Sequence, residues 1–154
     1  MLELRARVWD RAAPSLAGVE KRTLSGHSGC VRSCCFSPDG ASVLSGSRYD
    51  KTLKIWDAAT GDLMCTLEGH TACVLSCSWS GPEMVVSSSS DGTTRWWAKP
   101  QGGGFANVAT FFSSNPAQAL GVSGNGEPAQ HGMVVVVGND QGAVMIVKVI
   151  APDG

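Results

Sequence analysis

The sequence predicts an all-β fold built from repeated four-stranded antiparallel units, and three observations support this prediction. First, the stretches 26–57 and 69–98 are copies of one another, which indicates a tandem repeat. Second, short β-prone runs are separated by Gly, Pro, Asp and Ser, the residues that favour turns. Third, no stretch spaces its apolar residues with the 3.6-residue period of a helix. Helix is therefore expected to be nearly absent.

The two copies align in register over most of their length. The first five matched pairs are 43 residues apart, and the last two are 41 apart because the second copy is shorter. The pairs are His27 and His70, Cys30 and Cys73, Val31 and Val74, Cys34 and Cys77, Phe36 and Trp79, Asp50 and Asp91, and Trp56 and Trp97. Chance does not produce so many matches at fixed spacing, so the repeat is real.

Residues 1–25 are expected to form only half of a unit, its third and fourth strands. The stretch 2–10 alternates apolar with polar residues and ends in Trp9-Asp10, where the complete copy ends its third strand. The stretch 19–27 then leads into His27 as a fourth strand. The first two strands of this unit have no counterpart in the sequence.

The complete units are expected at 26–68 and 69–113. In the first, strands are predicted at 30–36, 41–47, 52–57 and 63–70, and Pro38-Asp39-Gly40 suits a type I turn. In the second, they are predicted at 73–79, 84–90 and 93–98, and a Gly-rich connector precedes a fourth strand at 108–112.

Residues 114–150 are expected to form a degenerate unit of three strands, at about 118–123, 133–138 and 143–149. This stretch has no Gly-His or Trp-Asp pair, and Val147 stands where the other copies have Trp. We therefore expect it to lack the polar contacts that those pairs would make.

Gly-His, then Phe-Ser-Pro-Asp-Gly, then a Ser-rich strand, an Asp and Trp-Asp resemble the WD-repeat β-propeller family over residues 20–98. The resemblance implies a partial WD-repeat β-propeller of about three blades, each a four-stranded antiparallel sheet. A closed ring needs roughly four to eight blades, so we expect the chain to be the C-terminal half of a larger propeller. Alone it would expose an apolar blade face, with self-association as a result.

The resemblance also implies a buried hydrogen-bond relay in each complete repeat, which runs from Trp through Ser to His and Asp. A buried imidazole needs partners for both ring nitrogens, and a carboxylate with a hydroxyl can supply them. Two serines of each second strand are alternatives for the hydroxyl. The implied residues are His27, Ser45 or Ser47, Asp50 and Trp56 in the first repeat, and His70, Ser87 or Ser89, Asp91 and Trp97 in the second.

Composition narrows the classes of partner. The chain has 154 residues, with 12 Lys and Arg against 13 Asp and Glu, so no basic excess favours nucleic acid. The longest apolar run, at 133–137, is far shorter than the roughly 20 residues of a membrane span. The N-terminus does not resemble a signal peptide, so the six Cys are expected to stay reduced in a cytoplasmic or nuclear protein.

A metal site is the alternative interpretation of the first repeat, because His27, Cys30, Cys34 and Cys35 are all potential zinc ligands. However, residues 30 and 34 on an extended strand would lie roughly 13 Å apart at about 3.3 Å per residue. One ion cannot bridge that distance. We therefore expect no metal and no cofactor, with Cys34 and Cys35 packing within the strand.

Catalysis is the second alternative, and it has little support. A thiolate nucleophile needs an adjacent base, but His27 is assigned to the relay and His131 lies in a Gly-rich turn with no nucleophile nearby. The Gly102–Gly104 run lacks the Lys and Ser or Thr of a phosphate-binding loop.

Propellers of the family bind partners mainly through the loops before the first strand and between the second and third strands. Here these loops are 26–31, 48–51, 69–74 and 90–93, and we call their surface the loop face. The candidate partner-binding residues on it are Cys30, Arg32, Arg48, Tyr49, Cys73, Leu75 and Ser90. Arg48 and Tyr49 are expected to bulge outward, because the first repeat has an extra residue there; the alternative is a merely variable loop.

The predicted function is that of a non-enzymatic scaffold for protein–protein interaction. One alternative is a C-terminal sensor of a larger NACHT- or apoptosome-type ATPase, because the stretch 134–149 is similar to degenerate last blades of such proteins. Another is a ubiquitin-ligase substrate adaptor. The docking signature of such adaptors, Trp-Asp-x-Arg, is missing here, because Ala12 and Ala59 stand at its last position.

Overall fold

The described part of the chain consists of antiparallel β-strands and their turns. A computed structural model describes residues 6–10, 19–99, 103–114, 116–123, 133–139 and 144–149, and none of them lies in a helix. The strands are β1 (Ala6–Asp10), β2 (Val19–Leu24), β3 (Val31–Phe36), β4 (Ser42–Ser47), β5 (Leu53–Asp57), β6 (Leu63–Leu67), β7 (Val74–Gly81), β8 (Met84–Ser89), β9 (Thr93–Ala98), β10 (Ala106–Phe112), β11 (Ala117–Ser123), β12 (Met133–Asn139) and β13 (Val144–Val149). The predicted all-β fold is confirmed.

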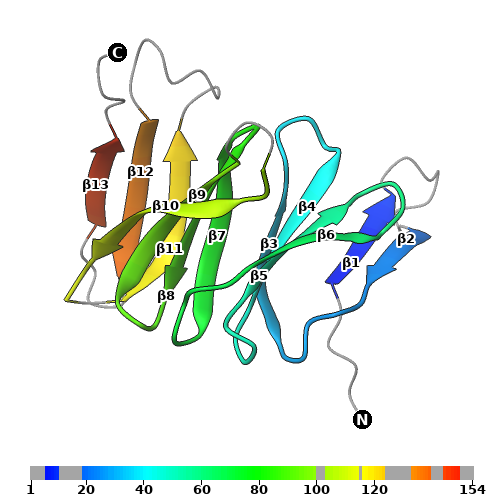
Figure 1. Ribbon diagram of the computed structural model, residues 1–154, viewed down its shortest axis with the longest axis horizontal. Helices are drawn as coiled ribbons and strands as arrows, with labels where there is room; N and C mark the ends of the chain where they lie inside the picture. Colours follow the sequence, from blue (N-terminus) through cyan, green and yellow to red (C-terminus); the bar gives the residue numbers. More distant parts are fainter. Residues whose placement is uncertain are drawn as a thin grey trace.

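The strands form four sheets in which each strand pairs with its neighbour in sequence. β1 pairs with β2, β3 to β6 and β7 to β10 form two four-stranded sheets, and β11 to β13 form a three-stranded sheet. Within the two complete units, the short turns that follow β3, β4, β5, β7 and β8 favour this antiparallel pairing of neighbouring strands. Figure 1 shows the sheets side by side along the long axis of the molecule, with β1 and β2 at one end and β13 at the other.

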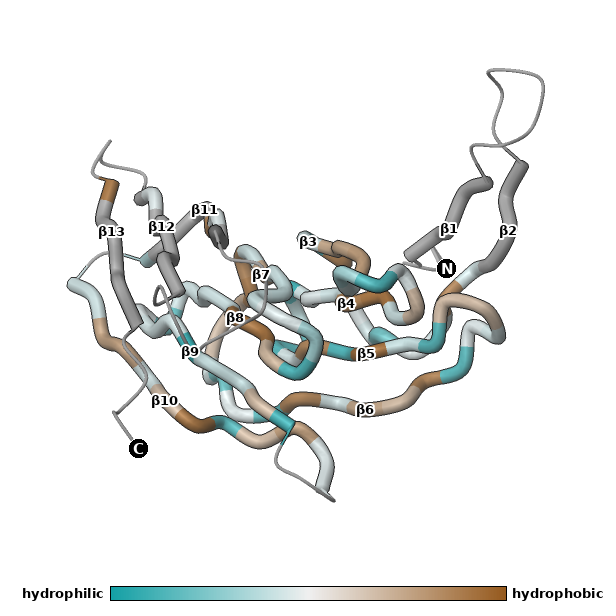
Figure 2. The backbone as a smooth tube through the Cα atoms, turned by 90° about the horizontal axis from the view of Figure 1, so that it is seen from above, coloured by the Kyte–Doolittle hydropathy of each residue, from teal (hydrophilic) through white to brown (hydrophobic). Residues whose placement is uncertain are grey.

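The first strand of each larger sheet lies on the same side of the molecule. β7 contacts β3 and β4 of the preceding sheet and β11 of the following sheet. In Figure 2, β3 and β7 lie on the concave side of the arc, and β6 and β10 follow its convex side. This radial arrangement is that of propeller blades.

Most of the described core lies between the two four-stranded sheets. Leu44, Leu53 and Ile55 of the first sheet pack with Val74 and Trp97 of the second in one buried cluster. Full burial of such apolar side chains is worth about 1.5–3 kcal/mol each. This packing holds the two complete blades together.

A smaller apolar cluster joins the N-terminal strands to the first blade. Leu24 of β2 is buried against Val43 and Trp56, with Val31 and Ala58 at the edge of the cluster. The N-terminal sheet therefore covers part of the outward face of this blade.

One face of β3 does not pack as the sequence suggested. Ser33 and Cys35 face β7, because the backbone N–H of Cys77 donates to Ser33 Oγ at 3.2 Å and the Cys35 thiol contacts the carbonyl of Cys77. Side chains alternate along a strand, so Cys34 points the other way and is exposed. The expectation that Cys34 packs within the strand is wrong. Phe36, on the same face, is 53% exposed.

The glycines before the two relay histidines lie close to side chains of the same blade. Gly26 and Gly69 have φ values of 154° and 148°, in the range that favours glycine. A Cβ atom on Gly26 would lie 3.1 Å from the ring of Trp56, and one on Gly69 would lie 2.9 Å from Arg95. The fourth strand β6 ends at Leu67, three residues before the predicted end at residue 70.

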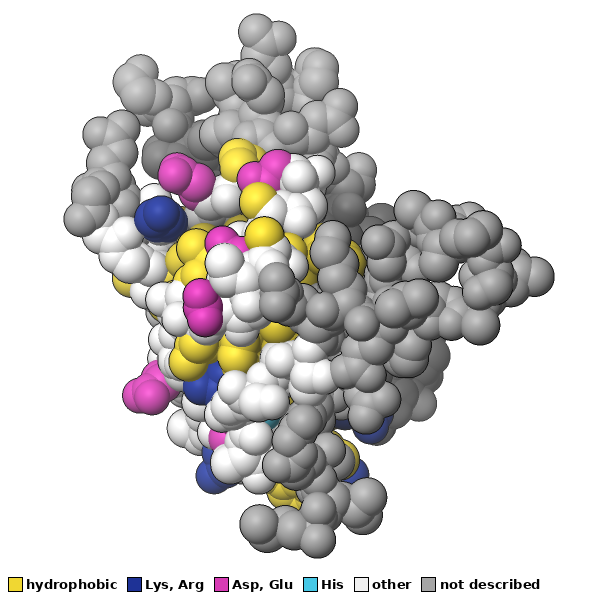
Figure 3. All heavy atoms as spheres, turned by 90° about the vertical axis from the view of Figure 1, so that its right-hand side faces the viewer, with side chains coloured by type: hydrophobic (Ala, Val, Ile, Leu, Met, Phe, Trp, Pro, Cys, Tyr) yellow, Lys and Arg dark blue, Asp and Glu magenta, His cyan; other side chains and the backbone are white. Residues whose placement is uncertain are grey.

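The surface at the N-terminal end is mixed in character. Figure 3 views the molecule from the side on which β1 and β2 lie, and apolar side chains appear there among scattered charged ones. Leu63 and Met64 of β6 are among the exposed apolar residues. Within the described residues, no helix is long and apolar enough to cross a membrane.

Candidate functional site

His27 connects three elements of the first blade through its ring. Its Nδ1 lies 2.8 Å from Oδ2 of Asp50, which follows β4, and its Nε2 lies 2.7 Å from Oγ of Ser45. The indole Nε1–H of Trp56 donates to the same Ser45 Oγ at 2.7 Å. The His27 side chain is almost fully buried. Both ring nitrogens therefore have partners within the blade.

The second blade repeats this arrangement. His70 Nδ1 lies 2.9 Å from Asp91 Oδ2, and its Nε2 lies 2.8 Å from Ser87 Oγ. Trp97 Nε1–H donates to Ser87 Oγ at 2.8 Å. The repeated geometry follows from the repeated spacing of the four residues, which the strand pairing of each blade brings together.

Of the two serines proposed for each relay, the structure brings only the first to the histidine. Ser47 is buried, and its hydroxyl has no hydrogen-bond partner among the described residues. Ser89 accepts from the backbone N–H of Asp91 and donates to the carbonyl of Ala72. Serines two apart in a strand point to the same face, so the sequence alone could not separate them.

Two threonines belong to these networks but were missed from the sequence. Thr52 Oγ1 donates to Asp50 Oδ1 at 3.0 Å, and Thr93 Oγ1 donates to Asp91 Oδ1 at 2.6 Å. Each also donates its backbone N–H to the same oxygen. The signal was present, because both repeats have Thr two residues after the Asp.

The electrostatics favour neutral rings. Burial lowers the pKa of His27 and of His70 below the ordinary value of 6.5, and it outweighs the opposing effect of the neighbouring carboxylates. In a neutral ring, one nitrogen donates and the other accepts. The network assigns the proton to Nδ1, which donates to the Asp, while Nε2 accepts from the Ser hydroxyl.

The two aspartates are held ionised. Burial works to raise the pKa of Asp91, but hydrogen bonds from Thr93, the backbone N–H of Thr71 and His70 together lower it to about 2. Burial likewise opposes ionisation of Asp50, and hydrogen bonds from His27 and Thr52 outweigh it, so its pKa is also lowered. Each pair is thus a neutral imidazole donating to a carboxylate.

The cysteines that suggested a metal site are dispersed. The ring nitrogens of His27 are occupied, Cys34 is exposed, and Cys35 contacts Cys77 on the neighbouring blade. In the part of the chain that the structure describes, no group of three or more His, Cys, Asp and Glu side chains is arranged to hold a metal ion. His131 lies outside the described residues.

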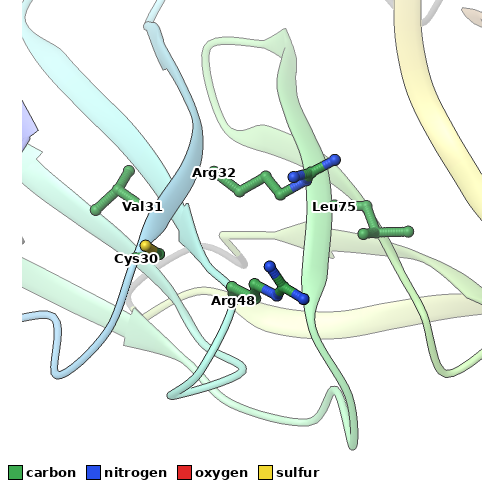
Figure 4. Close-up of a pocket in the computed structure, with 5 residues that line it drawn as sticks. All are labelled: Cys30, Val31, Arg32, Arg48 and Leu75. Atoms are coloured by element: carbon green, nitrogen blue, oxygen red, sulfur yellow. The ribbon is translucent and has the colours of Figure 1, made fainter.

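On the loop face, a pocket of about 420 Å³ lies between the two complete blades. Cys30, Val31 and Arg32 at the start of β3, Arg48 after β4 and Leu75 of β7 line it. Figure 4 shows that Arg32 and Arg48 both extend toward β7. The structure thus brings four of the predicted partner-binding residues, Cys30, Arg32, Arg48 and Leu75, to one pocket.

Tyr49 projects from the loop beside this pocket. Its side chain is 61% exposed, and the Arg48 guanidinium carbon lies 5.5 Å from the centre of its ring, within the range of a cation–π contact. Gly29 lies beneath it, because a Cβ atom there would be only 2.4 Å from Tyr49 Cβ. A larger residue at position 29 would displace the tyrosine.

The remaining two predicted residues, Cys73 and Ser90, occupy the equivalent loop of the second blade. The backbone N–H of Ser90 donates to the carbonyl of Cys73 at 2.9 Å, and that of Arg48 donates to the carbonyl of Cys30 at 2.8 Å. In both blades one hydrogen bond fastens the loop after the second strand to the start of the first strand. Cys73 and Ser90 do not line the pocket.

Comparison with known families decides the class. The family described as "WD domain, G-beta repeat" matches residues 18–57 and 61–98, the stretches that contain both histidine networks. The chain belongs to the WD-repeat family. Proteins with WD repeats are typically protein-interaction scaffolds. In this chain, the residues that line the pocket, and Tyr49 beside it, all lie within the two matched repeats.

Several WD-repeat relatives match part of the chain. A segment of 44 residues is 54% identical to the MST50-interacting protein 11 of Pyricularia oryzae, and one of 45 residues is 51% identical to the small ribosomal subunit protein RACK1 of Saccharomyces cerevisiae; each covers 29% of this chain and 14% of the relative. Protein tipD of Dictyostelium discoideum is 31% identical over 118 residues, 77% of this chain and 18% of tipD. The chain therefore matches less than a fifth of each relative's length.

Proposed function

We propose that this chain is a non-enzymatic scaffold segment that binds other proteins through the loop face of its two WD repeats. The observation that carries the proposal is the exposed Arg48–Tyr49 pair at the rim of a pocket between the blades. Arg and Tyr are favoured as anchors of protein interfaces, because they combine large contact areas with polar groups. The side chains of both residues lie outside the histidine networks and are exposed.

The names of two relatives agree with a binding role. One is called a MST50-interacting protein and another a ribosomal subunit protein. Both names describe proteins that associate with other macromolecules. These relatives match only 29% of this chain, so its partner has to be identified by binding experiments on this chain itself.

The double variant Arg32→Glu with Tyr49→Ala tests the proposal. Partners recovered from cell extract with the wild-type chain are identified by mass spectrometry, and direct binding of each purified partner is then titrated against both forms. We expect the variant to lose about tenfold or more in affinity, since two interface anchors are removed. Its melting temperature should stay nearly unchanged, because both side chains are exposed.

Met64→Ala is the matched control, because Met64 is a large exposed residue on β6, away from the loop face. It should bind partners as the wild-type chain does. Equal affinity of the wild type and the loop-face variant for every partner would remove this face as the binding site.

Two narrower functions stay predictions. A role as the sensor of a larger ATPase requires a nucleotide-binding domain in the same gene, and a role as a ubiquitin-ligase adaptor requires binding to a ligase subunit. The gene sequence upstream of Met1 tests the first, and a pull-down with purified ligase subunits tests the second.

A further inference from the structure

The pocket on the loop face contains two positive charges that no described carboxylate neutralises. Arg32 and Arg48 are both exposed and both line the pocket. The ion pairs that join two described residues are those of His27 with Asp50 and of His70 with Asp91, and neither involves Arg32 or Arg48. Asp50, the acid nearest in sequence to Arg48, is already bonded to His27, Ser28 and Thr52. The two guanidinium groups therefore have unused hydrogen-bond donors.

A guanidinium stays charged at physiological pH and presents its donors in a planar fork that matches an oxyanion. In Figure 4, Arg32 of β3 and Arg48 of the turn after β4 extend in the same direction toward β7. Like charges placed together repel one another, and an anion between them would remove this repulsion. The pair is therefore suited to an anionic group rather than to a neutral or cationic one.

The rest of the pocket suits a peptide side chain. Its volume of about 420 Å³ lies within the ordinary range of small-ligand sites. Leu75 and Val31 also line it, but Figure 4 shows their side chains pointing away from the two arginines. The exposed Tyr49 ring stands next to Arg48 and offers an apolar surface to the residues that flank an acidic side chain.

We infer that this pocket binds an acidic segment of a partner protein, with a carboxylate or phosphate oxyanion held between Arg32 and Arg48. The inference rests on the proposed function, since it names the chemistry of the partner at the same face. Nucleic acid also offers oxyanions, but the chain carries 12 Lys and Arg against 13 Asp and Glu. A nucleic-acid surface needs many basic residues along a stripe.

Peptides of equal length and matched sequence test the inference with the full chain. One peptide carries Glu and Asp, a second carries phosphoserine at the same positions, and a third carries Gln and Asn; binding is followed by fluorescence anisotropy. We expect an acidic peptide to bind at least about tenfold more tightly than the neutral one, and its affinity to fall as salt is added. Comparison of the first two peptides identifies carboxylate or phosphate as the preferred oxyanion.

Charge-removing variants locate the site. Arg32→Gln and Arg48→Gln should each weaken binding of the preferred peptide about tenfold, because each removes a charge-assisted hydrogen-bond donor. Lys99→Gln is the matched control: Lys99 is exposed just after β9, at the end of that strand opposite the loop face. It should leave binding unchanged.

Cys30 provides a reporter inside the pocket. It lines the pocket with the two arginines, whereas Cys34 is exposed on another face of β3. Saturating peptide should slow alkylation of Cys30 at least severalfold and leave alkylation of Cys34 unchanged, as measured by mass spectrometry. Slowing at both cysteines, or at neither, would contradict binding in this pocket.

Three results would overturn the inference: equal binding of acidic and neutral peptides, full binding by both arginine variants, or equally tight binding of a single-stranded RNA of the same charge. These failures differ from failure of the proposed function. If a partner protein depends on Tyr49 but not on Arg32 and Arg48, the loop face binds proteins and only the acidic specificity is wrong.

Discussion

Within each WD repeat, one histidine joins the loop before the first strand to the second strand and to the turn that follows it. The imidazole bridges a carboxylate and a serine hydroxyl, and the serine also takes the tryptophan N–H. Loss of one member leaves the others buried without partners, and each such group costs roughly 1–3 kcal/mol. These buried hydrogen bonds stabilise the blade, because they give each polar group of the network a partner away from water.

His27→Ala should therefore lower the free energy of unfolding by about 1–3 kcal/mol, because Ser45 and Asp50 lose a partner. Urea titration followed by tryptophan fluorescence measures this change. Ser47→Ala is the control, because that hydroxyl is buried in the same blade without a described hydrogen-bond partner; it should be neutral or slightly stabilising. An unchanged stability of His27→Ala would contradict a structural role for the histidine.

Stability should also depend on pH in a defined direction. The folded-state pKa of each relay histidine lies below 6.5, so the unfolded chain binds protons first as the pH falls. The stability that the two neutral histidines contribute to the folded state is fully present above pH 6.5. It is lost as the pH falls from 6.5 toward the folded-state pKa of each ring. Protonation of Asp91 adds a second loss of stability between pH 3.8 and about 2, because the pKa of this carboxyl is lowered to about 2 in the folded state.

Urea titrations in buffers from about pH 8 to about pH 3 measure this dependence. His70→Gln should reduce the loss of stability below pH 6.5 relative to the wild-type chain, because one of the two titrating rings is gone. If stability rose as the pH fell from neutral, the rings would be charged in the folded state and the assigned proton positions would be wrong.

At the scale of strands and sheets, close contact between the two complete blades depends on a missing side chain. A Cβ atom on Gly46 of β4 would lie 2.6 Å from Cγ1 of Val74 on β7, closer than such atoms can approach. The two sheets thus pack at a distance that only glycine allows at this position.

Gly46→Ala should destabilise the protein by about 1–3 kcal/mol, since the blades must separate or repack. Adding Val74→Ala should offset part of this overlap, and the two changes should not be additive because the residues touch. Gly104→Ala is the control, because a Cβ atom there meets nothing within 4 Å. Thermal melts of Gly46→Ala, Val74→Ala, the double variant and Gly104→Ala provide the measurement; additive effects of the two single changes would contradict the contact.

Strand positions were predictable from the sequence where the repeat itself supplied the signal. Turn residues and β-prone runs placed β3 to β9 to within a few residues. The exposure of Cys34 was missed, because it depends on which face of β3 a neighbouring blade covers. The choice of Ser45 over Ser47 was open for a similar reason, since both serines share one face of β4 and only the packed blade brings one of them to His27.

At the scale of the whole molecule, the blades form an arc with an exposed face on β3. Cys34 and Phe36 project from that face, whereas Arg32, at a register shift of β3, extends toward β7. The pocket, in turn, depends on the approach of β3 and β7 from different repeats, and no single repeat encodes it. The sequence predicted that Cys30, Arg32, Arg48 and Leu75 share the loop face. It did not predict that these four residues line one pocket.

The exposed apolar side chain on β3 should promote self-association of the isolated chain. Burial of a Phe side chain is worth about 1.5–3 kcal/mol, so Phe36→Lys should weaken association about tenfold or more. Sedimentation velocity over a range of concentrations measures this. Tyr49→Ala, which removes an exposed aromatic ring from the loop face, should leave the association constant unchanged. Equal association of Phe36→Lys and the wild type would exclude this face as the contact.

The hydrogen bonds from Arg48 to Cys30 and from Ser90 to Cys73 have a consequence for kinetics. Loops fastened to the sheet at this point have little freedom to lose when a ligand arrives, so little entropy opposes binding. Partners would meet a surface already in its bound shape, and the backbone would move by no more than about 1 Å. Differences in affinity among ligands should then appear mainly in their dissociation rates.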